Sequence, residues 1–127
     1  GFHENLNWLE NEAVIIVQIE NINAVENIEA ILSCEEVDGY IIGPYDLSAT
    51  MGLHGQFEHP DVVAALRKIR EAGAALKKPG GLHIVEPNPN ELKSRINEGF
   101  KFLAYSADIR MLDVSCREGL KIRDHTA

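Results

Sequence analysis

Two acidic residues, Glu20 and Asp46, are the side chains in this sequence that most directly suggest chemistry. Glu20 follows an apolar run at residues 13–19 that is rich in Val and Ile, a pattern typical of a strand buried on both faces. Asp46 follows a second such run, residues 37–43, after a Gly-Pro pair that indicates a tight turn. Parallel α/β sheets bind ligands at the carboxyl ends of their strands. We therefore expect both carboxylates to face one pocket, as two ligands of one divalent metal ion.

Other interpretations exist for each of these residues. A Glu at a strand end is often a helix cap or an ion-pair partner, and Asp46 alone could form an Asx-turn. His83 lies on an expected strand and is a weak catalytic candidate, because a hydrogen-bonded core histidine is the more common case. Ser106 precedes an expected helix and could either cap it or bind an anion there. The other histidines are expected in loops or at the surface: His3, His54, His59 and His125.

The chain alternates apolar runs with segments of helical periodicity. Helical spacing begins after Asn21 or Asn23, which could cap a first helix. A second helix is expected to begin at Pro60 and to end at Gly73. The remaining expected elements are strands at 81–85 and 100–106, a short helix from Asn88-Pro89 to Gly99, and a closing helix at 108–121. Residues 4–12 are expected to be a connecting segment.

Repeated strand–helix units predict parallel strands joined by right-handed crossovers. The 127 residues fit a single domain, and the architecture is either an open doubly wound sheet or part of an eight-stranded barrel. Periodicity alone does not choose between them. No GxGxxG sequence follows any expected strand, which disfavours dinucleotide binding.

Charge and composition limit the classes of partner. The formal net charge of −8 and the pI of about 5.0 disfavour nucleic-acid and anionic-membrane surfaces, since both require clustered Lys and Arg. Small molecules are the expected partners. Cys34 and Cys116 lack metal or redox spacing, which favours reduced thiols in a cytoplasmic protein.

Several segments together resemble one enzyme family. VQIE, GYIIGPYDLSATMG, GQFEHP, PGGLHIVEP and FLAYSADIRML are similar to segments of the C-terminal half of the HpcH/HpaI family, the metal-dependent 2-oxo acid aldolases. The similarity covers nearly the whole chain. The resemblance implies an oligomeric α/β protein with a (β/α)8 TIM barrel fold, of which this chain supplies roughly the last four βα units.

The resemblance also implies roles for individual residues. Glu20 and Asp46 become the protein ligands of Mg2+, Mn2+ or Co2+, since carboxylate oxygens suit these ions. The activity implied is reversible class II retro-aldol cleavage of a 4-hydroxy-2-oxo acid to pyruvate and an aldehyde. Gln18 would hydrogen-bond the oxo acid, and backbone N–H groups from Gly43 onward would hold its carboxylate. Tyr45 and Leu82 would line the part of the pocket that binds the aldehyde.

Two features depart from the family pattern. Many members have a small residue in place of Tyr45, which bears on acceptor specificity. The family's Arg and its His-containing base network come from the N-terminal half of the barrel. No arginine of this chain ends an expected strand, so the aldolase is expected to need that half. Because the chain begins at Gly1 without Met, we expect it to be a portion of a longer enzyme.

Three alternative functions follow from the same residues. A CoA-thioester lyase of the citramalyl or citrate type shares the barrel and the acidic metal site. A Schiff-base aldolase would need a desolvated lysine near the catalytic edge, and no lysine is expected there. A noncatalytic half-barrel is the third alternative, since exposed strand edges favour assembly with another chain.

Overall fold

The computed structural model describes residues 1–124 of the chain. The expectation that His125 lies at the surface concerns a residue outside this range. The elements, in order, are α1 (Phe2–Asn11), β1 (Ile16–Ile19), α2 (Ile22–Glu26), α3 (Ile28–Leu32), β2 (Gly39–Ile42), α4 (Pro44–Thr50), α5 (Pro60–Ala75), β3 (Gly80–Ile84), α6 (Pro89–Asn97), β4 (Phe102–Tyr105) and α7 (Asp108–Asp124).

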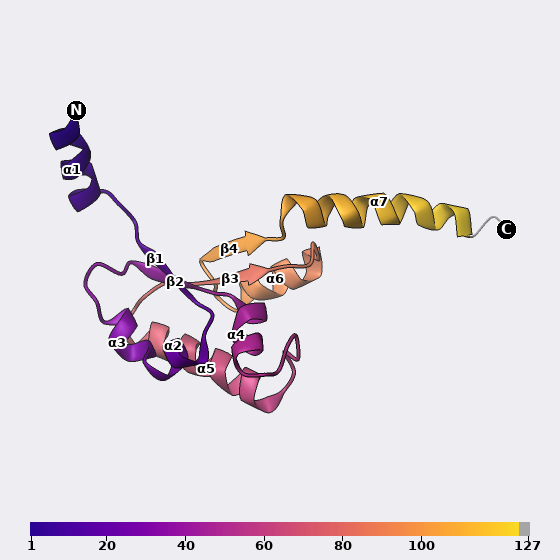
Figure 1. Cartoon of the computed structure of the whole chain (residues 1–127), viewed down its shortest axis with the longest axis horizontal. Coiled ribbons are helices and arrows are strands. Elements are labelled where there is room, and N and C mark those ends of the chain that lie inside the picture. Colours follow the sequence, from indigo (N-terminus) through magenta and orange to yellow (C-terminus); the bar gives the residue numbers. More distant parts are fainter. Residues whose placement is uncertain (125–127) are drawn as a thin grey trace.

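The four strands form one parallel sheet in the order β1-β2-β3-β4, as the repeated strand–helix pattern predicts. Helices α2, α3 and α5 gather on one side of it, whereas α1 and α7 extend from opposite ends of the molecule (Figure 1). Among the described residues, no helix is long and apolar enough to cross a membrane.

Helix starts follow local chemistry. The side chains of Asn21, His59 and Asn88 each accept a backbone N–H at a helix start, which satisfies donors that have no partner within the helix. Proline occupies the first position of α4, α5 and α6, where its missing N–H costs nothing. Gly99, at φ +93°, follows α6 in the left-handed conformation expected there.

Several expected boundaries were wrong. The first strand begins at Ile16, and Ile16 itself is 37% exposed, so this strand is not buried on both faces. Gly73 lies within α5 instead of ending it. Glycine is needed at this position because a Cβ there would overlap the ring of Tyr40. Residues 4–12 are mostly helix α1, and the helix expected before Leu32 is divided into α2 and α3 at Asn27.

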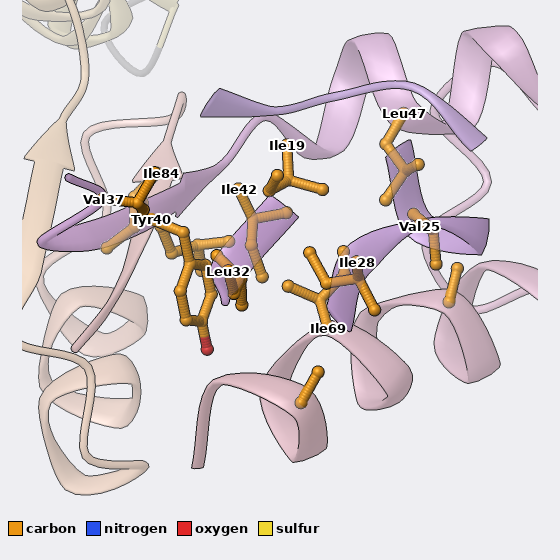
Figure 2. Close-up of a cluster of buried hydrophobic side chains, with 13 residues drawn as sticks. Ile19, Val25, Ile28, Leu32, Val37, Tyr40, Ile42, Leu47, Ile69 and Ile84 are labelled. Atoms are coloured by element: carbon orange, nitrogen blue, oxygen red, sulfur yellow. The ribbon is translucent and has the colours of Figure 1, made fainter. Parts of the chain in front are cut away.

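The apolar core lies between one face of the sheet and helices α2, α3 and α5. Ile19, Ile42 and Leu82 share a register row on this face and are buried, and Ile28 and Ile69 pack against them from the helices (Figure 2). On the opposite face, the neighbouring row contains the exposed Gln18 and Phe102. Only one face of the sheet is therefore covered by the described residues.

Candidate metal centre

Glu20 lies directly after β1, beside the residue that follows β2. A Cβ placed on Gly43 would be 3.1 Å from Glu20 Cβ and 3.2 Å from Glu20 Oε2. Gln18 Nε2 donates a hydrogen bond of 2.6 Å to Glu20 Oε2. Gln18 and Glu20 are two residues apart along an extended chain, so their side chains share the sheet face that the helices leave uncovered. The carboxylate is therefore oriented at the carboxyl end of the sheet.

Asp46 lies in the first turn of α4, the short helix that directly follows β2. The sequence was expected to form only a tight turn here, but residues 44–50 complete a helix capped by Gly43. The Gly43 N–H donates to Ile19 O, and Pro44 has no N–H. Within the described part of the chain, the N–H groups of Tyr45 and Asp46 have no hydrogen-bond acceptor. These two donors of a helix N-terminus point to a site suited to a carboxylate group.

The two acids fit a hard divalent cation. Carboxylate oxygens suit Mg2+ or Mn2+, and Mg2+ commonly keeps several waters and uses only one or two protein carboxylates. The described residues contain no group of three or more His, Cys, Asp or Glu side chains that could hold a metal ion. Gly43 leaves open the space beside Glu20 Oε2 that any side chain would fill. Glu20 and Asp46 would thus hold the ion, with substrate or water completing its coordination.

Tyr45 and Leu82, the expected aldehyde-side residues, share a different cavity. It has a volume of about 490 Å³ and is also lined by Phe57 and His83, but not by Gln18, Glu20 or Asp46. Tyr45 is 44% exposed, and its ring meets Phe57 edge-on with centroids 4.8 Å apart. Leu82 belongs to the buried core on the helix side of the sheet. The side chains of Tyr45 and Leu82 therefore line a cavity that Glu20 and Gln18 do not line.

His83 and Ser106 lie next to each other at the carboxyl ends of β3 and β4. His83 Nε2 is 3.4 Å from the Ser106 carbonyl oxygen, a contact whose donor depends on the histidine tautomer. Ser106 has φ +61°, and its Oγ is buried without a hydrogen-bond partner among the described residues. Helix capping, one of the two roles considered for Ser106, is therefore not formed.

One charged group at this edge was not anticipated from the sequence. Arg110 lies in the first turn after β4 and donates to Glu86, just beyond β3, over 2.7 Å from Nη2 to Oε2. It also contacts Asp113. The Glu86 hydrogen bond is the main cause that raises the pKa of Arg110. The position of Arg110 could have been recognised in the sequence, because a residue in the first turn of a helix that follows a strand lies at the carboxyl edge of the sheet.

Comparisons with known proteins point to one family. The family model described as HpcH/HpaI aldolase/citrate lyase matches residues 4–113. A hydroxypyruvate/pyruvate aldolase of Pseudomonas aeruginosa is 36% identical over 119 residues, covering 91% of this chain and 42% of that protein. A 5-keto-4-deoxy-D-glucarate aldolase of Escherichia coli is 38% identical over 95 residues, covering 75% of this chain and 36% of that protein.

A solved structure gives the same result. The HpcH/HpaI aldolase from Desulfitobacterium hafniense superposes with a TM-score of 0.85 at 29% identity, covering 100% of this chain and 49% of that one. The chain thus spans less than half the length of these relatives. Since the family model covers most of the sequence and the fold agrees, this chain belongs to the HpcH/HpaI aldolase/citrate lyase family.

Proposed function

We propose that this chain carries the metal-binding part of a class II aldolase, which reversibly cleaves a 4-hydroxy-2-oxo acid to pyruvate and an aldehyde. The observation that carries the proposal is the placement of Glu20 beside Gly43, next to the helix turn that contains Asp46. The names of the relatives, a hydroxypyruvate/pyruvate aldolase and a 5-keto-4-deoxy-D-glucarate aldolase, support a 2-oxo acid as the substrate class.

Each residue of the site has a proposed task. Glu20 and Asp46 hold Mg2+, Mn2+ or Co2+, and Gln18 orients Glu20 through its hydrogen bond and reaches the oxo acid. When bound, the ion supplies Lewis-acid stabilisation of the negative charge that develops on the substrate oxygen during carbon–carbon cleavage. The N–H groups of Tyr45 and Asp46 bind the substrate carboxylate, which fixes its orientation.

The chain is proposed to form half of a (β/α)8 barrel. Its four parallel strands leave one sheet face uncovered, with Phe102 47% exposed on it, and its relatives are more than twice as long. A complementary N-terminal half would cover that face, continue the sheet at β1 and β4, and supply an arginine and a proton-transferring base. The whole enzyme is proposed to be an oligomer in the cytoplasm.

Exchange of the pyruvate methyl protons tests the enzymatic proposal. Proton NMR of pyruvate in D2O would follow methyl exchange with this chain and Mn2+ or Mg2+, with and without chelator. Chelator-sensitive exchange would mean that the enolising site is complete in this chain or is completed by self-association. Bound metal without exchange would assign the base and arginine to a separate half, and absence of both metal binding and exchange would overturn the proposal.

Replacement of the two acids tests the metal site directly. We expect Glu20→Gln and Asp46→Asn each to weaken Mn2+ binding at least tenfold, about 1.4 kcal/mol, because each removes a charged ligand. Titration calorimetry of Mn2+ provides the measurement. Glu36→Gln is the matched control, since Glu36 is exposed in the α3–β2 connection and away from the site. Equal affinities in all three variants would rule out this ligand assignment.

Cleavage of a CoA thioester remains the second candidate, because the matching family model includes citrate lyases. A substrate comparison separates the two. If the chain, supplied with its complementary half, cleaves citramalyl-CoA but no free 4-hydroxy-2-oxo acid, the thioester lyase replaces the aldolase as the proposed activity.

A further inference from the structure

A second cavity lies at the opposite edge of the sheet, where β2 and β3 begin. Its volume is about 670 Å³, within the range of small-molecule sites in proteins. It is lined by Tyr40 at the start of β2, by the last turns of α5, by Gly80 at the start of β3, and by the α6–β4 connection up to Lys101. Glu20 and Asp46 lie at the other ends of the strands, so this cavity is separate from the candidate metal centre.

The cavity concentrates positive charge in an acidic chain. The whole chain carries a net charge of −8, yet five of its twelve Lys and Arg side chains line this cavity, together with only two carboxylates. The cations are Arg67, Arg70, Lys77, Lys78 and Lys101, and the carboxylates are Glu71 and Glu98. Arg67 and Arg70 pair with these two glutamates at 3.7 and 3.4 Å. Lys78 donates to the carbonyl oxygens of Val37 and Cys34.

Two of the five cations have no partner in the described part of the chain. The ammonium groups of Lys77 and Lys101 make no hydrogen bond or ion pair there. Lys77 also has φ +56°, in the left-handed region that is uncommon for a residue with a Cβ. The cavity therefore offers two uncommitted ammonium groups and an excess of three positive charges.

Tyr40 supplies a second, independent observation. Tyr40 as a whole residue is only 3% exposed and lines the cavity, and its hydroxyl has no hydrogen-bond partner among the described residues. Figure 2 shows its hydroxyl pointing away from the other labelled core side chains. Among the described residues, the buried polar atoms without a partner are Arg95 Nε and Ser106 Oγ, so the Tyr40 hydroxyl oxygen keeps accessible surface and can donate to a molecule in the cavity.

Two glycines make room for this tyrosine. A Cβ on Gly73 would overlap Tyr40 Cε1, and a Cβ on Gly80 would lie 2.5 Å from the Tyr40 hydroxyl oxygen. Burial also raises the pKa of the Tyr40 hydroxyl, an effect that Arg70 opposes. The hydroxyl therefore keeps its proton at neutral pH and can donate it to an acceptor in the cavity.

We propose that this cavity binds a small phosphate-bearing metabolite, with the Tyr40 hydroxyl and the ammonium groups of Lys77 and Lys101 contacting its phosphate oxygens. Phosphate oxygens accept hydrogen bonds from such donors, and a dianion or trianion matches the excess of three positive charges. The site lies outside the proposed aldolase centre, so either proposal can fail without the other.

Calorimetric titration of pyrophosphate into the chain tests this proposal, in metal-free buffer of low ionic strength. Saturable binding to the unaltered chain is expected. Tyr40→Phe removes only the hydroxyl and should weaken binding at least about fivefold, since hydrogen bonds to charged groups are among the stronger ones. Lys77→Gln with Lys101→Gln should weaken it at least about tenfold. Lys93→Gln is the matched control, because Lys93 is exposed on α6 and does not line the cavity.

Three results would overturn the proposal. The first is a titration without saturable binding in the unaltered chain. The second is equal affinity in Tyr40→Phe, the lysine variant and Lys93→Gln, which would indicate only nonspecific attraction between charges. The third is tighter binding of citrate than of pyrophosphate, which would assign the cavity to carboxylates. Thermal unfolding of each variant without ligand separates lost binding from lost folding.

Discussion

Gly43 is the residue that most closely links the backbone to the proposed chemistry. It directly follows β2, caps α4, and leaves the space beside Glu20 and Gln18 empty. Its φ of −99° is accessible to any residue, so its conformation does not require glycine. The close approach of Glu20 is the physical reason for glycine at this position.

We therefore expect Gly43→Ala to affect the site more than the fold. The added Cβ would be 3.1 Å from Gln18 Nε2 and 3.2 Å from Glu20 Oε2, and both side chains would have to move. We expect a loss of about tenfold in Mn2+ affinity, measured by titration calorimetry. Gly119→Ala is the control, since a Cβ there meets no atom within 4 Å. Unchanged Mn2+ affinity in Gly43→Ala would contradict the proposed position of Glu20 in the metal centre.

The placement of Glu20 and Asp46 just beyond strand ends was predictable, because Glu20 directly follows one apolar run and Asp46 follows the other after a turn sequence. The position of Glu20 beside Gly43 was not predictable, because it depends on which strands pair and in which register. Leu82 shows the converse. Its apolar type is consistent with a pocket wall, but a strand places alternate residues on opposite faces, and its register row faces the helices.

At the scale of elements, α7 is attached mainly through its first turns. Arg110 connects it to Glu86 beyond β3, and Asp113 bridges Arg110 and Arg117 within the helix. The hydrogen bond from Arg117 is the main cause that lowers the pKa of Asp113. Farther along, the large apolar side chains of Leu112 and Leu120 are exposed. The ionic group is thus the principal connection between α7 and the sheet in the described residues.

Removal of this connection should loosen α7 alone. We expect Arg110→Gln to speed amide hydrogen exchange in α7 by no more than about fivefold, because an exposed ion pair contributes little to stability. Exchange in β2 and β3 should not change. Arg67→Gln, which breaks only an exposed pair within α5, is the control. Faster exchange throughout the sheet would show that Arg110 supports the whole fold instead.

At the scale of the whole molecule, stability is concentrated in the middle of the chain. Among the residues whose burial the structure describes, the buried core runs from Ile19 to Ile84, on β1 to β3 or in the segments between them. Neither α6 nor β4 contains a fully buried residue, and α1 and α7 extend away from the core (Figure 1). Segments with few buried contacts open at lower free energy than the core.

Limited trypsin digestion should reveal this gradient, because both α5 and α7 contain basic residues. We expect the first cuts in α7, after Arg110, Arg117 or Lys121, at least about tenfold faster than cuts after Arg67, Lys68 or Arg70 in α5. Mass spectrometry of early fragments identifies the order. Simultaneous cleavage in both helices would mean that the chain unfolds as one unit.

The sequence alone determined the parallel α/β class, most helix starts and the placement of acidic residues just after β1 and β2. These features depend on local chemistry: apolar runs of Val and Ile, side chains that cap helices, and proline at a first helical position. Such signals act within a few residues and can be recognised without knowledge of distant contacts.

Only the tertiary structure decided which side chains meet. Position 73, inside α5, is a glycine because Tyr40, distant in sequence, occupies the space that a Cβ would need. The same packing places Tyr40 against the positively charged cavity formed by α5, β3 and the α6–β4 connection. Pairing and close packing between distant segments set these positions, and no local pattern in the sequence encodes them.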